Sequence, residues 1–189
     1  RNKKSITLDL RSEKACNIVW DLIKKSDVIV ENFKPGVIKK LGFGYEAVKN
    51  VKPDIVYASI SGFGQFGPYT DAAAYDLAIQ AISGLMSVTG FPDKPPVRVG
   101  TSISDILSGM YAAIGIISTL YSLKKDTEAS GQYIDVAMLD SAISVMENQV
   151  IRYTTSGEVP KRVGSRHAAG GPHNIYRTKD GYIVIVCGN

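Results

Sequence analysis

The chain has 189 residues, of which 44% are hydrophobic and 21% charged, a balance typical of an ordinary folded protein. Its formal net charge is +4, with lysines in scattered short pairs, so nucleic acid is a poor candidate partner and an anionic small molecule a better one. The cysteines, Cys16 and Cys187, suggest neither a disulfide framework nor a metal site, and we expect a cytoplasmic protein.

Strands and helices alternate at the beginning of the chain. Hydrophobic alternation predicts strands over 5–10, 28–30 and 55–60, and helical periodicity predicts helices over 13–25, 37–41 and 45–50. The first helix should be capped by Ser12 and should pack through Ala15, Ile18, Val19, Leu22 and Ile23. This order favours an α/β fold with a doubly wound, mostly parallel sheet of the Rossmann kind.

Helices predominate in the next part. They are predicted over 72–85, 106–123 and 139–156, with a strand over 132–137 and a terminal hairpin over 175–177 and 182–186. The helix 106–123 is interpreted as buried, not membrane-spanning, because an acid opens it and polar residues interrupt it; its Ile, Leu, Met, Ala and Tyr side chains should face the core.

Two domains are expected. Residues 1–157 should form a large α/β domain, and 158–189 a linker and the beginning of a smaller domain. Since the sequence begins without a methionine and its last predicted strand ends close to its last residue, we expect a fragment of a longer chain.

Two loops follow predicted strands, where ligands of parallel sheets bind. Residues 31–36 form one, and the other, 61–68, alternates glycines with Phe63, Gln65 and Phe66. Glycine lets backbone approach a ligand closely, but this spacing is not that of a nucleotide-binding motif. The second loop is therefore a candidate lid or a plain turn.

Asp105 is the strongest candidate for chemistry. It lies three residues after Ser102, which is suited to cap the helix that follows, so Asp105 should occupy the third helical position. The unpaired amides and the dipole at that end favour an ionised carboxylate. The pattern alone describes an ordinary capping acid more often than a reactive one.

Short segments spread along the whole chain carry a family resemblance. In order, they are Asn2-Lys3-Lys4-Ser5, Glu31-Asn32-Phe33-Lys34-Pro35-Gly36, Ser61-Gly62-Phe63-Gly64-Gln65, Ala74-Tyr75-Asp76, Gly100 with Asp105 and Gly109, Gly131-Gln132-Tyr133-Ile134-Asp135-Val136 and Asp180-Gly181-Tyr182. With them the chain resembles the class III coenzyme A transferases, a group that includes formyl-CoA and carnitine CoA transferases. Each segment alone is weak, but their shared order makes the match specific.

The resemblance implies transfer of CoA from an acyl-CoA to a carboxylic acid, through an aspartyl anhydride and an aspartyl-CoA thioester. Asp105 matches the nucleophilic aspartate of the family, and Tyr75 and Asp76 match residues of the same pocket. The loop residues Gly62, Phe63, Gly64 and Gln65 would approach the thioester, and their amides are candidate oxyanion donors.

The resemblance also implies which residues bind CoA, which is a substrate. It implies no permanently bound cofactor. Asn32, Phe33, Lys40 and Leu41 match positions near its adenine end, and Lys3, Lys4 and Lys40 would offer charge to phosphates. Similar enzymes form interlocked homodimers, so the predicted helices 106–123 and 139–156 should expose apolar surface for a partner.

Two alternatives remain. An α-methylacyl-CoA racemase of the same superfamily needs a histidine where this chain has Ser104, and serine does not exchange a proton at neutral pH. If the chain is not a racemase, Asp135 is structural. His167 and His173 lie in a loop and have no assigned role. The other alternative is a CoA-binding module without chemistry, and we expect the isolated fragment to be inactive.

Overall fold

The computed structural model describes residues 2–126, 128–168 and 170–187. The chain divides into two compact units, one formed by residues 1–74 and 107–138 and the other by residues 75–106 and 139–189. Each unit is described by itself. The boundary near residue 157 that the sequence suggests stays a prediction.

A parallel sheet forms the centre of the first unit. Its strands are β1 (Val28–Glu31), β2 (Val56–Ser61) and β3 (Tyr133–Ala137), paired in the order β1-β2-β3. Glu31, Ser59 and Asp135 lie in register, so their side chains share one face near the carboxyl ends of the strands. The predicted α/β fold with a parallel sheet is confirmed.

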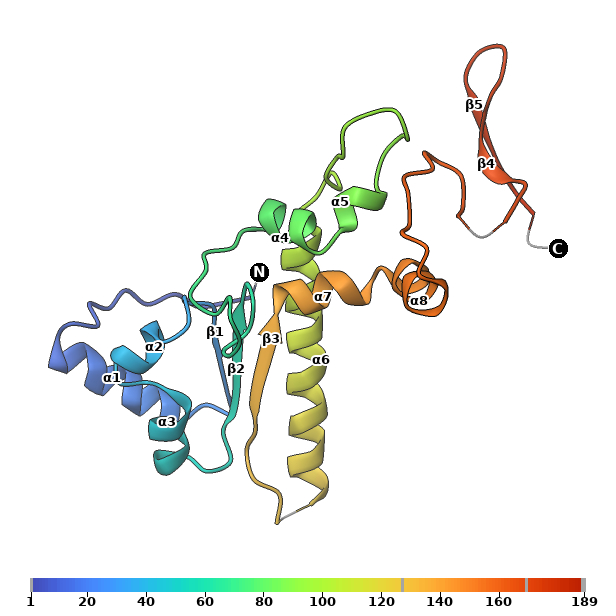
Figure 1. Ribbon diagram of the computed structural model, residues 1–189. Helices are drawn as coiled ribbons and strands as arrows, with labels where there is room; N and C mark the ends of the chain where they lie inside the picture. Colours follow the sequence, from blue (N-terminus) through green and yellow to red (C-terminus); the bar gives the residue numbers. More distant parts are fainter. Residues whose placement is uncertain (1, 127, 169, 188–189) are drawn as a thin grey trace. The chain divides into compact units, whose positions relative to one another are not determined.

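Helices α1 (Glu13–Lys24), α2 (Val37–Lys40) and α3 (Tyr45–Val51) lie on one side of this sheet, and α6 (Ile103–Lys125) on the other (Figure 1). The core on the first side is a buried cluster of Ile23, Phe43, Val48, Ile55 and Tyr57. Burial raises the pKa of the Tyr57 hydroxyl, which donates a 2.8 Å hydrogen bond to the Phe43 carbonyl.

Some predictions for the beginning of the chain are wrong. Residues 5–10 form no strand and lie mostly exposed, with 61% of Ile6 accessible. Ser12 occupies the N-cap position of α1 but makes no capping bond through its side chain. Ile18 and Leu22 are exposed, because α1 packs through Ala15 and Ile23.

Helix α6 packs in the opposite sense to the prediction. Its buried residues are small: Ser104, Ser108, Ala112 and Thr119. Its large apolar side chains are exposed instead: Ile106, Met110, Tyr111, Ile114, Ile117 and Tyr121. Close packing explains this, since a Cβ on Gly115 would lie 3.2 Å from Ile134 of β3.

The length and apolar composition of α6 would also allow it to cross a membrane. Those properties are weak evidence by themselves, because core helices of other proteins share them. The polar residues on its buried face and the acid in its first turn fit a helix packed on a sheet.

The second unit contains α4 (Asp76–Ile82), α5 (Leu85–Val88), α7 (Met138–Ser144) apart from its first residue, and α8 (Glu147–Ser156), with the antiparallel hairpin of β4 (His173–Arg177) and β5 (Tyr182–Val186). The predicted helix 72–85 is therefore shorter and divided at Gly84, which has a φ of +87°. The predicted helix 139–156 is likewise interrupted between α7 and α8.

Candidate active site

Asp105 lies in the first turn of α6, as predicted. The helix begins at Ile103, so Ser102 precedes it and Asp105 is its third residue. The carboxylate is exposed, and it forms no hydrogen bond or ion pair within the described part of the chain. It is therefore open to a reagent from solvent.

Asp76 holds the beginning of this helix. Its buried carboxylate accepts a 2.9 Å hydrogen bond at Oδ1 from the backbone amide of Ser104. Asp76 thus caps α6 from another element, across 28 residues of sequence. The family resemblance implies that Asp76 lines the pocket, and the capping role adds to that prediction.

Gln80, which sequence reasoning missed, completes the arrangement. It is fully buried, and its Nε2 donates to Oδ2 of Asp76 at 2.7 Å and to the Thr101 carbonyl at 3.3 Å. Its Oε1 accepts a 2.8 Å bond from the amide of Val99. The available signal was the four-residue spacing between Asp76 and Gln80 on a helix.

The pKa of Asp105 is raised, whereas stabilisation by the beginning of the helix would lower it. Partial desolvation raises the pKa of the Asp105 carboxyl, and the negative charge of Asp76 raises it further. The Ser104 amide donates to Asp76, so this amide does not stabilise an ionised Asp105. The result is a carboxylate that is more basic, and hence more nucleophilic once ionised, than an ordinary aspartate.

Tyr75 immediately precedes α4, and 82% of its side chain is accessible. Its carbonyl accepts the first helical bond, from the amide of Ile79. Tyr75, Asp76 and Asp105 all belong to the second unit, where the Asp76–Ser104 bond joins α4 to the beginning of α6.

The glycine loop belongs to the first unit and is held against β3. The amide of Gln65 donates a 2.8 Å bond to Oδ2 of Asp135. Gly64 has a φ of +82°, and a Cβ there would lie 3.3 Å from the same oxygen, while a Cβ on Gly62 would collide with Ala74. The Gln65 amide therefore has an acceptor in Asp135, and the role of the loop amides as oxyanion donors stays a prediction.

Polar atoms without partners gather beside this loop. Ser61 Oγ, Gln65 Nε2 and Asp135 Oδ1 are buried, and none of the described residues bonds to them. Gln65 also lines a cavity of about 770 Å³ together with Ser59, Tyr45 and Tyr133. Buried polar atoms of this kind are usually satisfied by water or a ligand, and the predicted structural role of Asp135 stays a prediction.

The residues predicted to hold CoA also lie in the first unit. The Nδ2 of Asn32 donates a 2.7 Å bond to the Ile60 carbonyl, which ties the ends of β1 and β2 together. Phe33 is 44% accessible, and Lys4 and Lys40 are exposed. Leu41 packs against the core cluster, so its role is at least partly structural.

The groups relevant to a racemase are also placed. Ser104 is fully buried and binds Asp76 through its backbone. The rings of His167 and His173 stack with centroids 4.7 Å apart in the second unit, and Asp135 belongs to the first unit.

Sequence relatives agree with the resemblance. The chain is 42% identical, over its whole length, to an acetyl-CoA:oxalate CoA-transferase of Acetobacter aceti, of which it covers 48%. It is 38% identical to a human succinyl-CoA:glutarate CoA-transferase, of which it covers 43%. The chain thus spans about half the length of the curated relatives it matches.

A solved structure has the same fold. A CaiB/BaiF family protein from Brucella suis superimposes with a TM-score of 0.91 and 41% identity, over 100% of this chain and 50% of the other. Residues 1–189 match the family described as CoA-transferase family III. The chain therefore belongs to CoA-transferase family III.

Proposed function

We propose that the protein containing this chain transfers CoA from an acyl-CoA donor to a carboxylic acid acceptor, with Asp105 as the nucleophile. The observation that carries this proposal is the exposed Asp105 at the beginning of α6, whose carboxyl pKa is raised by partial desolvation first and by the negative charge of the buried Asp76 second. Relatives named for oxalate and glutarate support short dicarboxylic acids as the acceptor class.

The proposed reaction proceeds through exchanges at carbonyl carbons. The Asp105 carboxylate attacks the thioester carbonyl of the donor, and the CoA thiolate leaves, which forms a mixed anhydride. The thiolate then attacks the Asp105 carbonyl carbon and expels the donor acid, leaving an aspartyl-CoA thioester. The acceptor carboxylate repeats these steps in reverse, so Asp105 returns to its initial form and no net proton is consumed.

The environment of Asp105 suits this role. A carboxylate is a weak nucleophile, and both burial and the repulsion from Asp76 raise the free energy of its charged form. Forming the anhydride removes that charge, so the repulsion is relieved during the first step. The network of Asp76 and Gln80 fixes the helix end on which Asp105 lies.

The substrate CoA would bind to the first unit through Asn32, Phe33, Lys4, Lys40 and Leu41, as the family resemblance implies. The exposure of Phe33, Lys4 and Lys40 supports contact with a ligand. We also propose an interlocked homodimer in the cytoplasm. The apolar surface of α6 supports a partner, because obligate interfaces are more apolar than ordinary surface.

The test is Asp105→Asn in the full-length protein, with transfer measured across a panel of acyl-CoA donors and dicarboxylic acids. Transfer should fall by at least a thousandfold while thermal stability is unchanged, because the Asp105 side chain is exposed and holds no other described residue in place. Glu147→Gln, in the first turn of α8, is the matched control and should leave transfer intact. Activity of Asp105→Asn within tenfold of the unaltered enzyme would refute the role.

The racemase alternative has a separate test. Full-length protein in deuterated water should not place deuterium at the α-carbon of a 2-methylacyl-CoA, because Ser104 replaces the required histidine. Steady exchange that Asp135→Asn abolishes would overturn the transferase proposal at the level of reaction type.

A further inference from the structure

A basic cavity of about 580 Å³ lies in the second unit, on residues that the proposed reaction does not use. Ser87 and Pro92 line it on one side, and Pro160, Lys161, Arg162 and Arg166 on the other. A cavity of this volume is within the range of small-ligand sites. Its charged lining is made of cations alone.

The shape of this cavity is fixed by its backbone. The amide of Gly164 donates a 3.0 Å bond to the Gly90 carbonyl, which joins the two walls. Gly164 has a φ of +67°, and a Cβ there would lie 2.9 Å from the ring of Phe91. The two segments therefore approach as closely as glycine allows.

Arg162 is held in one orientation by the opposite wall. Its Nε donates to the Phe91 carbonyl at 3.2 Å and its Nη1 to the Ser87 carbonyl at 3.4 Å. These acceptors are neutral, so the positive charge of Arg162 remains uncompensated. Lys161 and Arg166 are exposed beside it.

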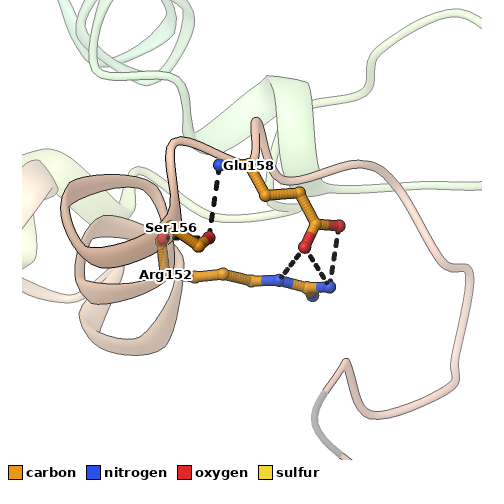
Figure 2. A network of polar contacts seen from close by, with 3 residues as sticks. All are labelled: Arg152, Ser156 and Glu158. Carbon is orange, nitrogen blue, oxygen red and sulfur yellow. Dashed lines mark hydrogen bonds and ion pairs between the residues drawn. The ribbon is translucent and has the colours of Figure 1, made fainter.

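The acids nearby do not neutralise these side chains. No ion pair within the described residues includes Lys161, Arg162 or Arg166. Glu158, the acid closest to them along this segment, is bound by Arg152 instead, with Nη2 to Oε1 at 2.8 Å and Nε to Oε2 at 3.1 Å (Figure 2). The backbone amide of Glu158 also donates a 3.2 Å hydrogen bond to Oγ of Ser156.

We propose that this cavity binds the oxyanion group of a small ligand, a carboxylate or a phosphate, through Lys161 and Arg166, with Arg162 as a prepositioned third charge. Guanidinium groups match the geometry of such planar or tetrahedral oxyanions, and a lysine adds a mobile point charge. The site is distinct from Asp105, so it can be present or absent whether or not Asp105 is the nucleophile.

The experiment measures binding to the full-length protein by calorimetry, with glutarate, inorganic phosphate and CoA as separate probes. The variants are Lys161→Gln, Arg166→Gln and their combination, because these side chains are exposed and their loss should leave the fold intact. Arg162 is left unchanged, since it joins the two walls. Lys179→Gln is the matched control, because Lys179 is an exposed lysine outside the cavity lining and has no ion pair among the described residues.

Each single variant should raise the Kd of at least one probe by about tenfold. Added salt should reduce the difference in Kd between the variant and the unaltered protein. Weaker glutarate binding assigns the cavity to a carboxylate, and weaker binding of CoA or inorganic phosphate assigns it to a phosphate. The proposal is overturned if the combined variant binds all three probes as the unaltered protein does, or if Lys179→Gln weakens them equally. Loss of transfer in Asp105→Asn leaves these binding results unchanged, so the two proposals fail separately.

Discussion

The Oδ1 atom of Asp76 lies 2.9 Å from the backbone nitrogen of Ser104 and accepts its proton, so the side chain of one helix caps the beginning of another. This bond takes the amide that would otherwise be available to Asp105. It also places a buried negative charge near Asp105, whose pKa is raised. The residue that caps α6 therefore also adds, after partial desolvation, to the raised pKa of the candidate nucleophile.

Asp76→Asn should shift the acid side of the pH profile of kcat/KM to lower pH. Asp105 must be ionised to attack, so activity is lost as pH falls through its raised pKa. The variant removes the charge repulsion from Asp76, so the pKa of Asp105 should fall. Partial desolvation still raises that pKa, so the fall should be incomplete. Profiles of both proteins with a single donor and acceptor are the measurement, and an unchanged acid limb would contradict the assignment of Asp76.

Gln80→Leu should destabilise the protein by about 2–4 kcal/mol, because it leaves Oδ2 of Asp76 and the Val99 amide without their partner. Denaturant unfolding measures the change. Gln149→Leu on α8 is the control, since the side chain of Gln149 makes no hydrogen bond within the described residues and its loss should cost under about 1 kcal/mol. Equal losses of unfolding free energy in both variants would show that the hydrogen bonds of Gln80 do not stabilise the fold.

Gly64→Ala should lower both stability and transfer. The φ of +82° is unfavourable for alanine, and the new Cβ would meet Asp135, so a loss of about 1–3 kcal/mol is expected. Gly100→Ala is the control, because its φ is not positive and open space surrounds a Cβ there. Thermal melts and transfer rates of the two variants should differ clearly, whereas similar behaviour would argue against a constrained loop.

The exposed face of α6 should be an interface in the whole protein. Ile117 is 66% accessible, and Ile117→Asp should convert the proposed dimer to monomer at low micromolar concentration. Ser118→Asp, an exposed neighbour on the same helix, should leave the dimer intact. Sedimentation velocity distinguishes them, and a monomeric unaltered protein would contradict the interlocked dimer.

The sequence predicted the elements whose pattern is local. The strands β1, β2 and β3 and the first turn of α6 were found because buried strands and a capped helix leave periodic signals. The segment 5–10 has the same alternation but pairs with no described strand, and a strand needs a partner that local sequence does not supply.

The rest depended on contacts between distant residues. The inward face of α6 carries small residues because β3 approaches closely, as Gly115 and Ile134 show, and hydrophobicity alone indicated the opposite face. The hydrogen bond between Asp76 and Ser104 spans 28 residues, so no local sequence pattern predicts it. The same holds for the contact between Gln65 and Asp135.

The most direct test of the nucleophile follows an oxygen atom. Full-length protein is incubated with an acyl-CoA and an acceptor acid whose carboxylate carries oxygen-18, and the peptide containing Asp105 is then weighed. In the proposed reaction the acceptor leaves one of its oxygens on the Asp105 carboxylate in each turnover, so that peptide should gain about 2 Da after one cycle and about 4 Da after many. Turnover that leaves the Asp105 peptide unlabelled would contradict the proposal.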